Sequence, residues 1–347
     1  MLWLAIRSKN SLTYTRESVN IPFSIIIAAR NEAVNLQRYL PFLLSQVHAK
    51  YEVIIALDRC EDNSLEVVKS FQMQYKNLRF VEIQTVPEGW SPKKYALTQA
   101  IALAQHPHLA LTDADCEVGK YWLQHLSAAF VNSSAEIVLG IGYYYPYSGL
   151  LNAFIRFETF YTAFQYLGFC KLGLPYMGIG RNIAYQKAVF EKYKGFEAFK
   201  NYLSGDDDLF VNQYAKKNTT VCLFHEESHT YSEPKMTVRA WFRQKFRHVS
   251  AANAYTWQTK ALLTLFHFSH LAIYFFGALS FLLAEQKMWV VFLFLGRLLL
   301  SWGIFIVANT WLKAKKMLYI YPVFDILYFF YNACIVPIGL IKKPTWN

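Results

Sequence analysis

The sequence predicts an α/β domain with a mostly parallel, twisted sheet and helices on both faces, followed by C-terminal transmembrane helices. Before residue 261, short β-branched runs alternate with helical patterns, which is typical of a parallel sheet. After it, long apolar runs follow one another with few charges. We therefore expect four segments: an N-terminal segment at 1–20, the α/β domain at 21–235, an amphipathic juxtamembrane helix at 236–260 and a membrane domain at 261–347.

The composition has an apolar excess. Hydrophobic residues make up 54% of the 347 residues and charged residues only 17%, whereas a soluble domain is typically about 25% charged. This balance excludes a disordered chain, a collagen-like repeat and a small disulfide scaffold, and it argues against an ordinary soluble protein. The region from 261 to 347 is poor in charge. Its charged residues are Glu285, Lys287, Arg297, Lys313, Lys315, Lys316, Asp325, Lys342 and Lys343.

The first elements of the sheet follow from short-range patterns. Residues 23–29 (FSIIIAA) form a β-branched apolar run and predict the first strand. The next stretch places five apolar side chains on one helix face. These are Leu36, Tyr39, Leu40, Leu43 and Leu44. Residues 51–57 (YEVIIAL) predict the second strand, and Asp62 is placed to cap the helix that follows.

The third and fourth strands are predicted at 78–83 and 108–112, with a helix at 96–104 between them. Ligands of parallel α/β sheets bind beyond the carboxyl ends of the strands. Polar clusters follow three of the four predicted strands: Arg30-Asn31-Glu32, Asp58-Arg59 and Asp113-Ala114-Asp115. The chain contains neither GxGxxG nor a Walker P-loop, so a dinucleotide dehydrogenase or an ATPase would lack its phosphate loop.

Three apolar runs, at 262–284, 288–309 and 317–341, each reach the roughly 20 residues that a helix needs to cross a bilayer core of about 30 Å. A buried helical core is the alternative, but three such runs in succession are rare in soluble proteins. Arg297 and Asp325 fall inside the second and third runs. Charges at that depth are costly, so we expect these two to pair and hold the helices together, in preference to a role in substrate passage.

Basic residues suggest how the spans are oriented. The segment before the first span and the loop at 312–316 are both rich in lysine or arginine, which favours the cytoplasmic side. Three spans then leave the C-terminus on the opposite side. The aromatic stretch at 143–178 fits either an interfacial helix on the membrane or a plain core helix, and the sequence leaves both open.

Asp113 and Asp115 flank one small residue at the end of a predicted strand. In an extended segment, side chains two residues apart share a face. Two carboxylates in that arrangement can hold a hard divalent ion, with phosphate oxygens completing its shell. Surface acid pairs are common, but this position after a buried strand favours the metal interpretation.

A second acidic cluster lies at 204–210 (SGDDDLF). Three consecutive acids repel one another, which raises the pKa of at least one carboxyl, as a general base requires. The alternative is a helix N-terminus, where acidic side chains are favoured by the helix dipole. Both interpretations are compatible, because an apolar helical face follows the acids.

Two basic motifs suit phosphate groups. Residues 241–248 form an amphipathic helix in which Gln244, Arg247 and His248 share a face. That helix can meet anionic lipid or neutralise a diphosphate. Lys93 begins a lysine pair at the start of another helix, a position that suits phosphate, although a solvated pair is equally compatible with the spacing.

Taken in order, these motifs resemble glycosyltransferase family 2, whose fold is of the GT-A type, in its membrane-anchored bacterial branch. FSIIIAARNE is similar to the family's opening strand and turn, ALDRCEDNS to its nucleotide-binding segment and SPKKYALTQAI to its phosphate-side helix. TDADC matches its DxD motif, SGDDDLF resembles its catalytic-base motif and QKFRH resembles QxxRW. The resemblance covers about residues 20–250.

The resemblance implies a membrane-bound inverting glycosyltransferase that moves a sugar from a nucleotide-diphosphate sugar, in the first place a UDP-sugar, to a hydroxyl of a lipid or glycan. Asp206 would be the catalytic base, with Asp207 in reserve, and Asp113 and Asp115 would hold Mg²⁺ or Mn²⁺. The implied donor contacts are Ala28, Arg30, Glu32, Asp58, Lys93, Asp113, Gln244, Arg247 and His248.

Arg181 and Asn182 resemble the family's acceptor-side turn. Three positions depart from the family pattern. Leu57 stands where many members have Asp, Gly205 replaces a Glu before the base, and His248 replaces the Trp that is typical of processive synthases. The last difference favours transfer of a single sugar. A processive polysaccharide synthase is the runner-up, and a non-catalytic membrane scaffold or transporter with a degenerate transferase domain is the alternative of a different class.

Of the net charge of +11, residues 261–347 carry +5. The remaining +6 fits a cytoplasmic domain that is held against anionic membrane lipids and handles a diphosphate. It does not suggest a nucleic-acid partner. We therefore expect a multi-pass protein of the bacterial inner membrane, with its catalytic domain in the cytoplasm.

Overall fold

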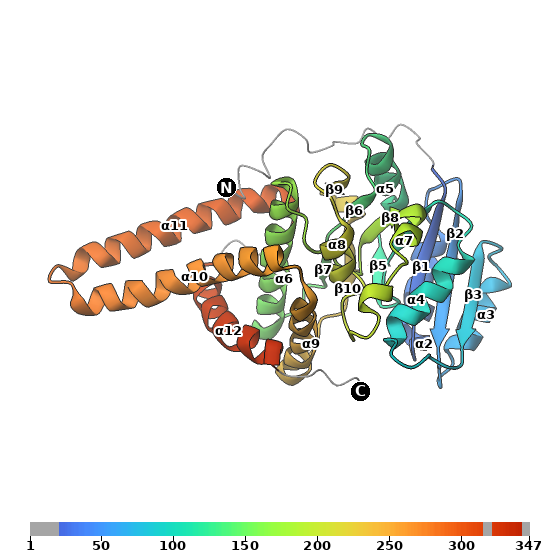
Figure 1. Cartoon of the computed structure of the whole chain (residues 1–347), viewed down its shortest axis with the longest axis horizontal. Helices are drawn as coiled ribbons and strands as arrows, with labels where there is room; N and C mark the ends of the chain where they lie inside the picture. The colour runs from blue at the N-terminus through green and yellow to red at the C-terminus, as the bar shows by residue number, and fades with distance from the viewer. Residues whose placement is uncertain (1–20, 315–320, 342–347) are drawn as a thin grey trace.

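The computed structural model describes residues 21–314 and 321–341. Two parts lie end to end in Figure 1: an α/β domain on the right and a group of long helices on the left. The predicted N-terminal segment at 1–20, and the first residues of the third predicted span, lie outside the described residues. The order of the two parts along the chain is the predicted one.

The main sheet has seven strands in the order β3-β2-β1-β4-β8-β6-β9. Neighbouring strands from β3 to β4 run parallel, β8 is antiparallel to β4 and β6, and β6 and β9 are again parallel. The mostly parallel sheet is therefore confirmed. The strands are β1 (Phe23–Ala29), β2 (Tyr51–Asp58), β3 (Leu78–Ile83), β4 (His108–Leu111), β6 (Ile137–Leu139), β8 (Ile183–Gln186) and β9 (Thr220–Cys222).

The first half of the sheet follows the sequence pattern closely. The predicted bounds of β1 and β3 are confirmed, while β2 is one residue longer than predicted and β4 one residue shorter. The five apolar side chains predicted for the first helix are all buried on α2. Asp62 accepts hydrogen bonds at two helix starts, from Ser64 N of α3 at 3.0 Å and from Ala33 N of α2 at 2.9 Å.

Helices cover both faces of the sheet, because alternate side chains of a strand point to opposite sides. Phe23, Ile25 and Ile27 of β1 pack with apolar residues of α2, α3 and α5, whereas Ile26 packs with those of α4. The helices of this domain are α2 (Ala33–Leu44), α3 (Ser64–Gln72), α4 (Pro92–Leu103), α5 (Trp122–Val131), α6 (Leu150–Lys171), α7 (Lys187–Lys192) and α8 (Asp208–Tyr214).

A smaller sheet, which the sequence did not reveal, lies beside the main one. Its three strands are ordered β5-β10-β7, with β10 antiparallel to β5 and parallel to β7. Their bounds are β5 (Cys116–Val118), β7 (Gly142–Tyr144) and β10 (Thr230–Ser232). Each is only three residues long, and β10 pairs with partners about 90 or more residues earlier, so local periodicity carries no sign of them.

Helix α6 settles the question left open by the aromatic stretch: it is a core helix. It packs between the sheet strands and the long helices (Figure 1). Phe157 and Phe160 contact Phe305, with ring centroids 5.9 and 4.4 Å apart, and Tyr166 donates a hydrogen bond to Gly140 O at 2.6 Å. The helix therefore joins the two parts of the molecule through buried aromatic rings.

Within the described residues, three helices are long and apolar enough to cross a membrane. They are preceded by the amphipathic helix α9, which packs against α12. Their bounds are α9 (Val238–Ala251), α10 (Trp257–Leu283), α11 (Lys287–Leu312) and α12 (Tyr321–Ile341). Helix α9 ends at Ala251 and α10 begins at Trp257, four residues before the predicted start of the membrane domain at residue 261.

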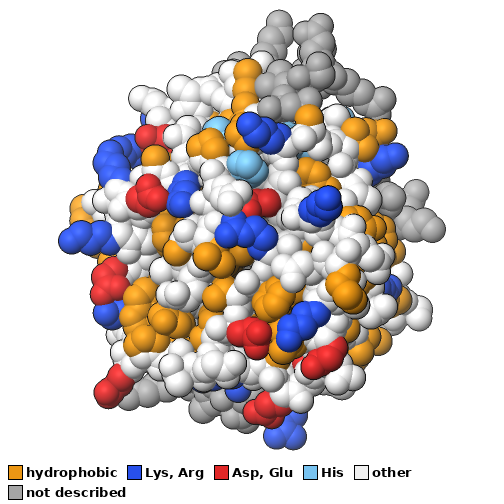
Figure 2. Space-filling model, turned by 90° about the vertical axis from the view of Figure 1, so that its right-hand side faces the viewer, with side chains coloured by type: hydrophobic (Ala, Val, Ile, Leu, Met, Phe, Trp, Pro, Cys, Tyr) orange, Lys and Arg blue, Asp and Glu red, His pale blue; other side chains and the backbone are white. Residues whose placement is uncertain are grey.

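The two ends of the molecule differ in surface chemistry. Figure 2 shows the end away from the long helices, where basic and acidic side chains are interspersed, as on a solvated surface. The α10–α11 hairpin instead exposes large apolar side chains over its length, as a lipid-facing surface would. Among them are Leu265, Phe275, Leu282, Leu283, Trp289, Leu293, Leu299 and Leu300.

The predicted ion pair between Arg297 and Asp325 is confirmed, and it joins α11 to α12. Asp325 is 1% exposed. Its carboxylate also accepts hydrogen bonds from Tyr274 Oη at 2.6 Å and Tyr321 Oη at 3.2 Å, and it lies 3.4 Å from His270 Nε2. Because Tyr274 and His270 belong to α10, this one carboxylate links all three long helices.

We predict that Asp325→Leu destabilises the helical part by about 3–5 kcal/mol, because it leaves the partly buried Arg297 without its carboxylate partner. Replacing both residues, as Arg297→Met with Asp325→Leu, should recover most of that loss. Chemical unfolding of the detergent-solubilised chain measures both effects. A double variant no more stable than Asp325→Leu would contradict the pairing as the source of the loss.

Candidate active site

A cavity of about 690 Å³ opens beyond the carboxyl ends of β1, β2 and β4. This is where the strand order reverses, since β2 and β4 lie on either side of β1, and such a switch point is the usual ligand site of an open α/β sheet. The cavity brings together every predicted site residue except Asn182. The predicted residues that line it are Ala28, Arg30, Glu32, Asp58, Lys93, Asp113, Asp115, Arg181, Asp206, Asp207, Gln244, Arg247 and His248.

Two left-handed residues turn the chain at the ends of β1 and β2. Asn31 has φ of 55° and Arg59 has φ of 47°. Asn31 Oδ1 accepts a hydrogen bond from Glu61 N at 2.8 Å, so the two turns are tied together. The Arg59 guanidinium holds the buried Asp58 carboxylate through two bonds of 2.8 and 3.1 Å. Glu32 stands beside them, and burial raises the pKa of its carboxyl.

Asp113 and Asp115 reach the cavity from a turn between β4 and β5, and not from the extended segment that the sequence predicted. Ligand atoms of Asp113, Asp115 and Cys116 lie within 4.8 Å of one another. Burial, reinforced by the charge of Asp113, raises the pKa of the Asp115 carboxyl. Burial also raises the pKa of the Cys116 thiol well above its usual range, so the thiol stays protonated. The donors that remain are two carboxylates, which fit a hard divalent cation.

Lys93 joins the two acidic clusters of the cavity. Its Nζ lies 2.8 Å from Asp113 Oδ1 and 2.9 Å from Asp206 Oδ2. Burial alone would lower the pKa of Lys93, but the facing carboxylates, Asp113 and Asp206 foremost, outweigh it and hold the pKa well above its usual value. Lys93 is therefore a fixed positive charge between the two clusters.

The three consecutive acids have different surroundings. Burial raises the pKa of Asp206, but the ammonium groups of Lys93 and Lys94 outweigh burial and hold that pKa below its usual value. Burial and the neighbouring Asp206 raise the pKa of Asp207 to about 6. Burial and the charge of Asp207 raise the pKa of Asp208 to about 8. Asp206 is thus the carboxylate of the three that is most readily ionised.

Backbone and side-chain bonds fix the other two acids in place. Asp207 caps α8, with Oδ1 accepting from Asp208 N at 2.7 Å and Oδ2 accepting from Gly180 N at 2.5 Å. Asp208 accepts from Tyr255 Oη at 2.6 Å. The helix-start interpretation of this cluster is therefore confirmed.

Lys94, which the sequence left as a possibly solvated neighbour of Lys93, is fully buried. Its Nζ donates to Tyr202 O at 2.5 Å and to Ser204 O at 2.7 Å, which holds the acidic loop against α4. Gly205, in the position where the family pattern has Glu, adopts φ of 97°. A Cβ there would lie 2.4 Å from the Leu209 side chain, so this turn requires glycine.

The wall opposite the sheet comes from α9. Gln244 Nε2 donates to Tyr144 Oη at 3.2 Å, and the Tyr144 ring lies 4.3 Å beneath the Arg181 guanidinium. Lys245, also on α9, forms an ion pair with Glu158 of α6. The sequence analysis did not select Tyr144, Lys245 or Glu158, since nothing in the local pattern shows that α6 and α9 meet across the cavity.

Asn182, the predicted acceptor-side residue that does not line the cavity, has its side chain in the core. It is 0% exposed. Its Oδ1 accepts from Trp122 Nε1 at 3.0 Å, and its Nδ2 donates to Ile141 O at 2.8 Å and Ser228 O at 2.7 Å. The neighbouring Arg181 does line the cavity, where its Nη1 donates to Ser232 Oγ at 2.7 Å. Asn182 thus supports the turn that presents Arg181.

A comparison with protein families shows the family of this chain. The model of glycosyl transferase family 21 matches residues 34–333. The chain belongs to glycosyl transferase family 21. The match extends from the first helix of the α/β domain into the last long helix, so both parts are covered. The motifs resemble family 2, whereas the family shown is family 21; the glycosyltransferase class is common to both.

One curated relative and two solved structures are similar to this chain. Glycosyltransferase AglE of Haloferax volcanii is 27% identical over 144 residues, which are 40% of this chain and 45% of that protein, so the alignment spans less than half of the relative. The mannosyltransferase PcManGT from Pyrobaculum calidifontis, solved in complex with GDP-Man and Mn²⁺, aligns with a TM-score of 0.56 and 16% identity over 95% of this chain and 94% of its own. S. aureus TarS 1–349 aligns with a TM-score of 0.47 and 17% identity over 89% of each chain. The family 21 chain has a GT-A-type fold.

We predict that Asp208→Asn stabilises the chain more at pH 8.5 than at pH 5. The folded pKa of about 8 lies above the ordinary value of 3.8. Between these two pH values the folded state keeps a proton that the unfolded state has lost, so the wild type loses stability as the pH rises. Asparagine preserves the shape and can donate to Tyr255 Oη. Thermal unfolding at the two pH values measures the difference, with Glu61→Gln, an exposed carboxylate, as the control. An equal gain at both pH values would contradict a protonated Asp208.

Proposed function

We propose that this family 21 chain is a membrane-bound inverting glycosyltransferase. It moves one sugar from a nucleotide-diphosphate sugar to a hydroxyl of a lipid or glycan acceptor. The observation that carries the proposal is the Lys93 bridge, which fixes the carboxylates of the DxD motif and the acidic loop on opposite sides of one ammonium group. The transfer needs this arrangement, because a donor diphosphate requires cation sites on one side and an acceptor hydroxyl requires a base on the other.

The donor nucleotide would lie at the ends of β1 and β2. Ala28, Arg30, Glu32 and Asp58 line that part of the cavity, and their oxygen and nitrogen atoms suit a base and a ribose. We keep a UDP-sugar as the proposed donor. The GDP-Man bound to the Pyrobaculum mannosyltransferase is consistent with the wider class, a nucleoside diphosphate sugar.

Asp113 and Asp115 would hold Mg²⁺ or Mn²⁺, since they offer hard oxygen donors whose mutual repulsion a cation relieves. Such an ion would supply positive charge to the diphosphate that leaves. Lys93 adds a fixed charge on the same side. Gln244 and Arg247, on the α9 wall, place an amide and a guanidinium where they can bind phosphate oxygens, and His248 lies at the same wall.

Asp206 is the proposed base. It is ionised at neutral pH, because Lys93 and Lys94 hold its pKa low. The raised pKa that the sequence led us to expect of the base belongs instead to Asp207 and Asp208. Both carboxylate oxygens of Asp207 accept backbone N–H groups, one from Asp208 in the same loop and one from Gly180 in another turn. Asp207 is therefore the reserve candidate. Asp206 would take the proton of the acceptor hydroxyl as that oxygen bonds to the anomeric carbon, while the bond to the diphosphate breaks on the opposite face. One displacement of this kind inverts the anomeric carbon.

The proposal of a membrane-borne acceptor rests on α6. Glu158 and Thr162 of this helix line the cavity, while Phe157 and Phe160 of the same helix contact Phe305 of α11. The cavity therefore borders the helices that are apolar enough to cross a membrane. Arg181 is the proposed acceptor-side residue.

Two alternatives are less well supported. A non-catalytic scaffold would be expected to lose carboxylates, whereas those of the cavity are present and held in position. A processive synthase remains the runner-up, and the length of the product on a defined acceptor separates it from single transfer. The bacterial inner membrane, with a cytoplasmic catalytic side, stays a prediction from the sequence.

We predict that Asp206→Asn lowers kcat for sugar transfer by about 10²–10⁴-fold, the usual contribution of a general base, while the affinity for the nucleotide is retained. Transfer is measured with the donor that a panel of nucleotide sugars identifies through metal-dependent hydrolysis, and binding by calorimetry. Glu61→Gln is the matched control. If Asp206→Asn retains transfer and Asp207→Asn loses it, the base is Asp207.

Asp115→Asn tests the metal assignment. We expect the affinity for a nucleoside diphosphate in the presence of Mn²⁺ to fall at least about tenfold. Loss of a side chain that binds the ion directly should cost more than loss of one that only supports a ligand, which typically costs about 10–100-fold. In EDTA, wild type and variant should bind the nucleotide alike. The same affinity for both proteins in Mn²⁺ would remove Asp115 from the metal site.

A further inference from the structure

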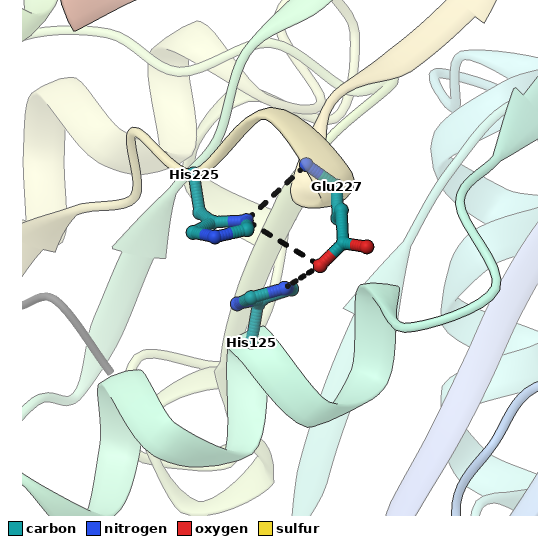
Figure 3. A group of neighbouring side chains, drawn as sticks. All are labelled: His125, His225 and Glu227. Atoms are coloured by element: carbon teal, nitrogen blue, oxygen red, sulfur yellow. Dashed lines mark hydrogen bonds and ion pairs between the residues drawn. The ribbon is translucent and has the colours of Figure 1, made fainter. Parts of the chain in front are cut away.

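A second group of metal-ligating side chains lies outside the cavity. His125 projects from α5, His225 precedes the short helix η2 (Glu226–Ser228), and Glu227 lies within η2 (Figure 3). None of the three lines the proposed active site. The proposed sugar transfer therefore makes no use of them.

The three side chains converge on one carboxylate oxygen. Glu227 Oε2 lies 3.3 Å from His125 Nε2 and 3.9 Å from His225 Nδ1, as the dashed lines in Figure 3 mark. The two imidazole rings stack, with centroids 3.9 Å apart and planes at 21°. One ligand atom of each residue lies within 4.8 Å of the other two.

This arrangement matches the needs of a zinc ion. Ligand bonds of about 2.0–2.2 Å in tetrahedral geometry separate the ligand atoms by roughly 3.3–3.6 Å, close to the two distances from Glu227 Oε2. Two imidazole nitrogens and one carboxylate oxygen, as these three residues offer, are donors that zinc takes in proteins. We propose that His125, His225 and Glu227 form a Zn²⁺ site, with water as the fourth ligand.

The backbone around the site is held before any ion binds. Glu227 O packs so closely on Gly119 that a Cβ at that position would lie 2.4 Å from it. Ser228 Oγ donates to His225 O at 2.5 Å, and Ser228 O accepts from Asn182 Nδ2 at 2.7 Å. Ion binding would require the two imidazole rings to turn out of their stacked arrangement, and His225 Nδ1 to give up the hydrogen bond that it accepts from Glu227 N at 3.3 Å.

The ion would connect two segments that lie about 100 residues apart in the chain. It would tie α5 to the segment between β9 and β10, and β10 ends at Ser232, which accepts a hydrogen bond from Arg181. The proposed role is thus structural: the site stabilises the small sheet that supports one side of the cavity, and takes no part in the reaction.

The test uses the full chain, purified in detergent without an affinity tag, stripped with EDTA and titrated with ZnCl₂ alone. We expect the wild type to bind one equivalent of Zn²⁺ at this site and to show a higher Tm when it is bound. The Asp115→Asn variant should bind the same equivalent. His225→Gln and Glu227→Gln are changes at partly exposed positions. Each should lower the affinity for this Zn²⁺ ion by more than about 100-fold, since loss of a side chain that binds the ion costs more than loss of one that only supports a ligand.

His106→Gln is the matched control, because it removes a partly buried histidine outside the cluster and should leave the equivalent intact. Far-ultraviolet circular dichroism of the metal-free variants checks that each is folded. The proposal is overturned if wild type binds only the zinc that Asp115→Asn loses, or if the His225→Gln and Glu227→Gln variants retain the wild-type equivalent and its rise in Tm.

Discussion

Lys93 occupies the point on which the arrangement of the cavity depends. The DxD motif and the acidic loop approach it from opposite sides, and their carboxylates would repel each other in a partly buried space without a cation between them. A lysine that contacts Asp113 at 2.8 Å and Asp206 at 2.9 Å sets the separation of the two clusters. It also leaves Asp206 ionised, whereas Asp207 and Asp208 have raised pKa values.

The ammonium group of the neighbouring Lys94 has a different role. It is fully buried and points away from the cavity to two carbonyls of the segment that leads into the acidic loop. The two consecutive lysines at the start of α4 thus have different roles. Lys93 faces the reacting groups, and Lys94 fixes the loop that carries the base. This division of roles is possible because successive side chains of a helix point in different directions.

The parts that the sequence predicted are those governed by local patterns or by one strong constraint. β1 and α2 follow from apolar periodicity over a few residues, and the Arg297–Asp325 pair follows from the high cost of a lone charge among apolar helices. The three-residue strands β5, β7 and β10 escaped prediction because their pairing joins distant segments. The sequence also does not show that the Asn182 side chain lies in the core, because a motif gives the position of a residue in the chain but not the direction of its side chain.

The same limit explains the histidine cluster. His225 and Glu227 are two residues apart, which by itself suggests nothing, and their third partner arrives from α5 only when the sheets have formed. Asn182 then connects the cluster with the cavity, since it bonds Ser228 on one side and stands next to Arg181 on the other. The strands of the smaller sheet are short and share few backbone hydrogen bonds. They therefore depend on hydrogen bonds from side chains more than the strands of the main sheet do. A cavity built partly on three-residue strands needs external support, and the Asn182 bonds supply it on one side while the α6–α9 ion pair supplies it on the other.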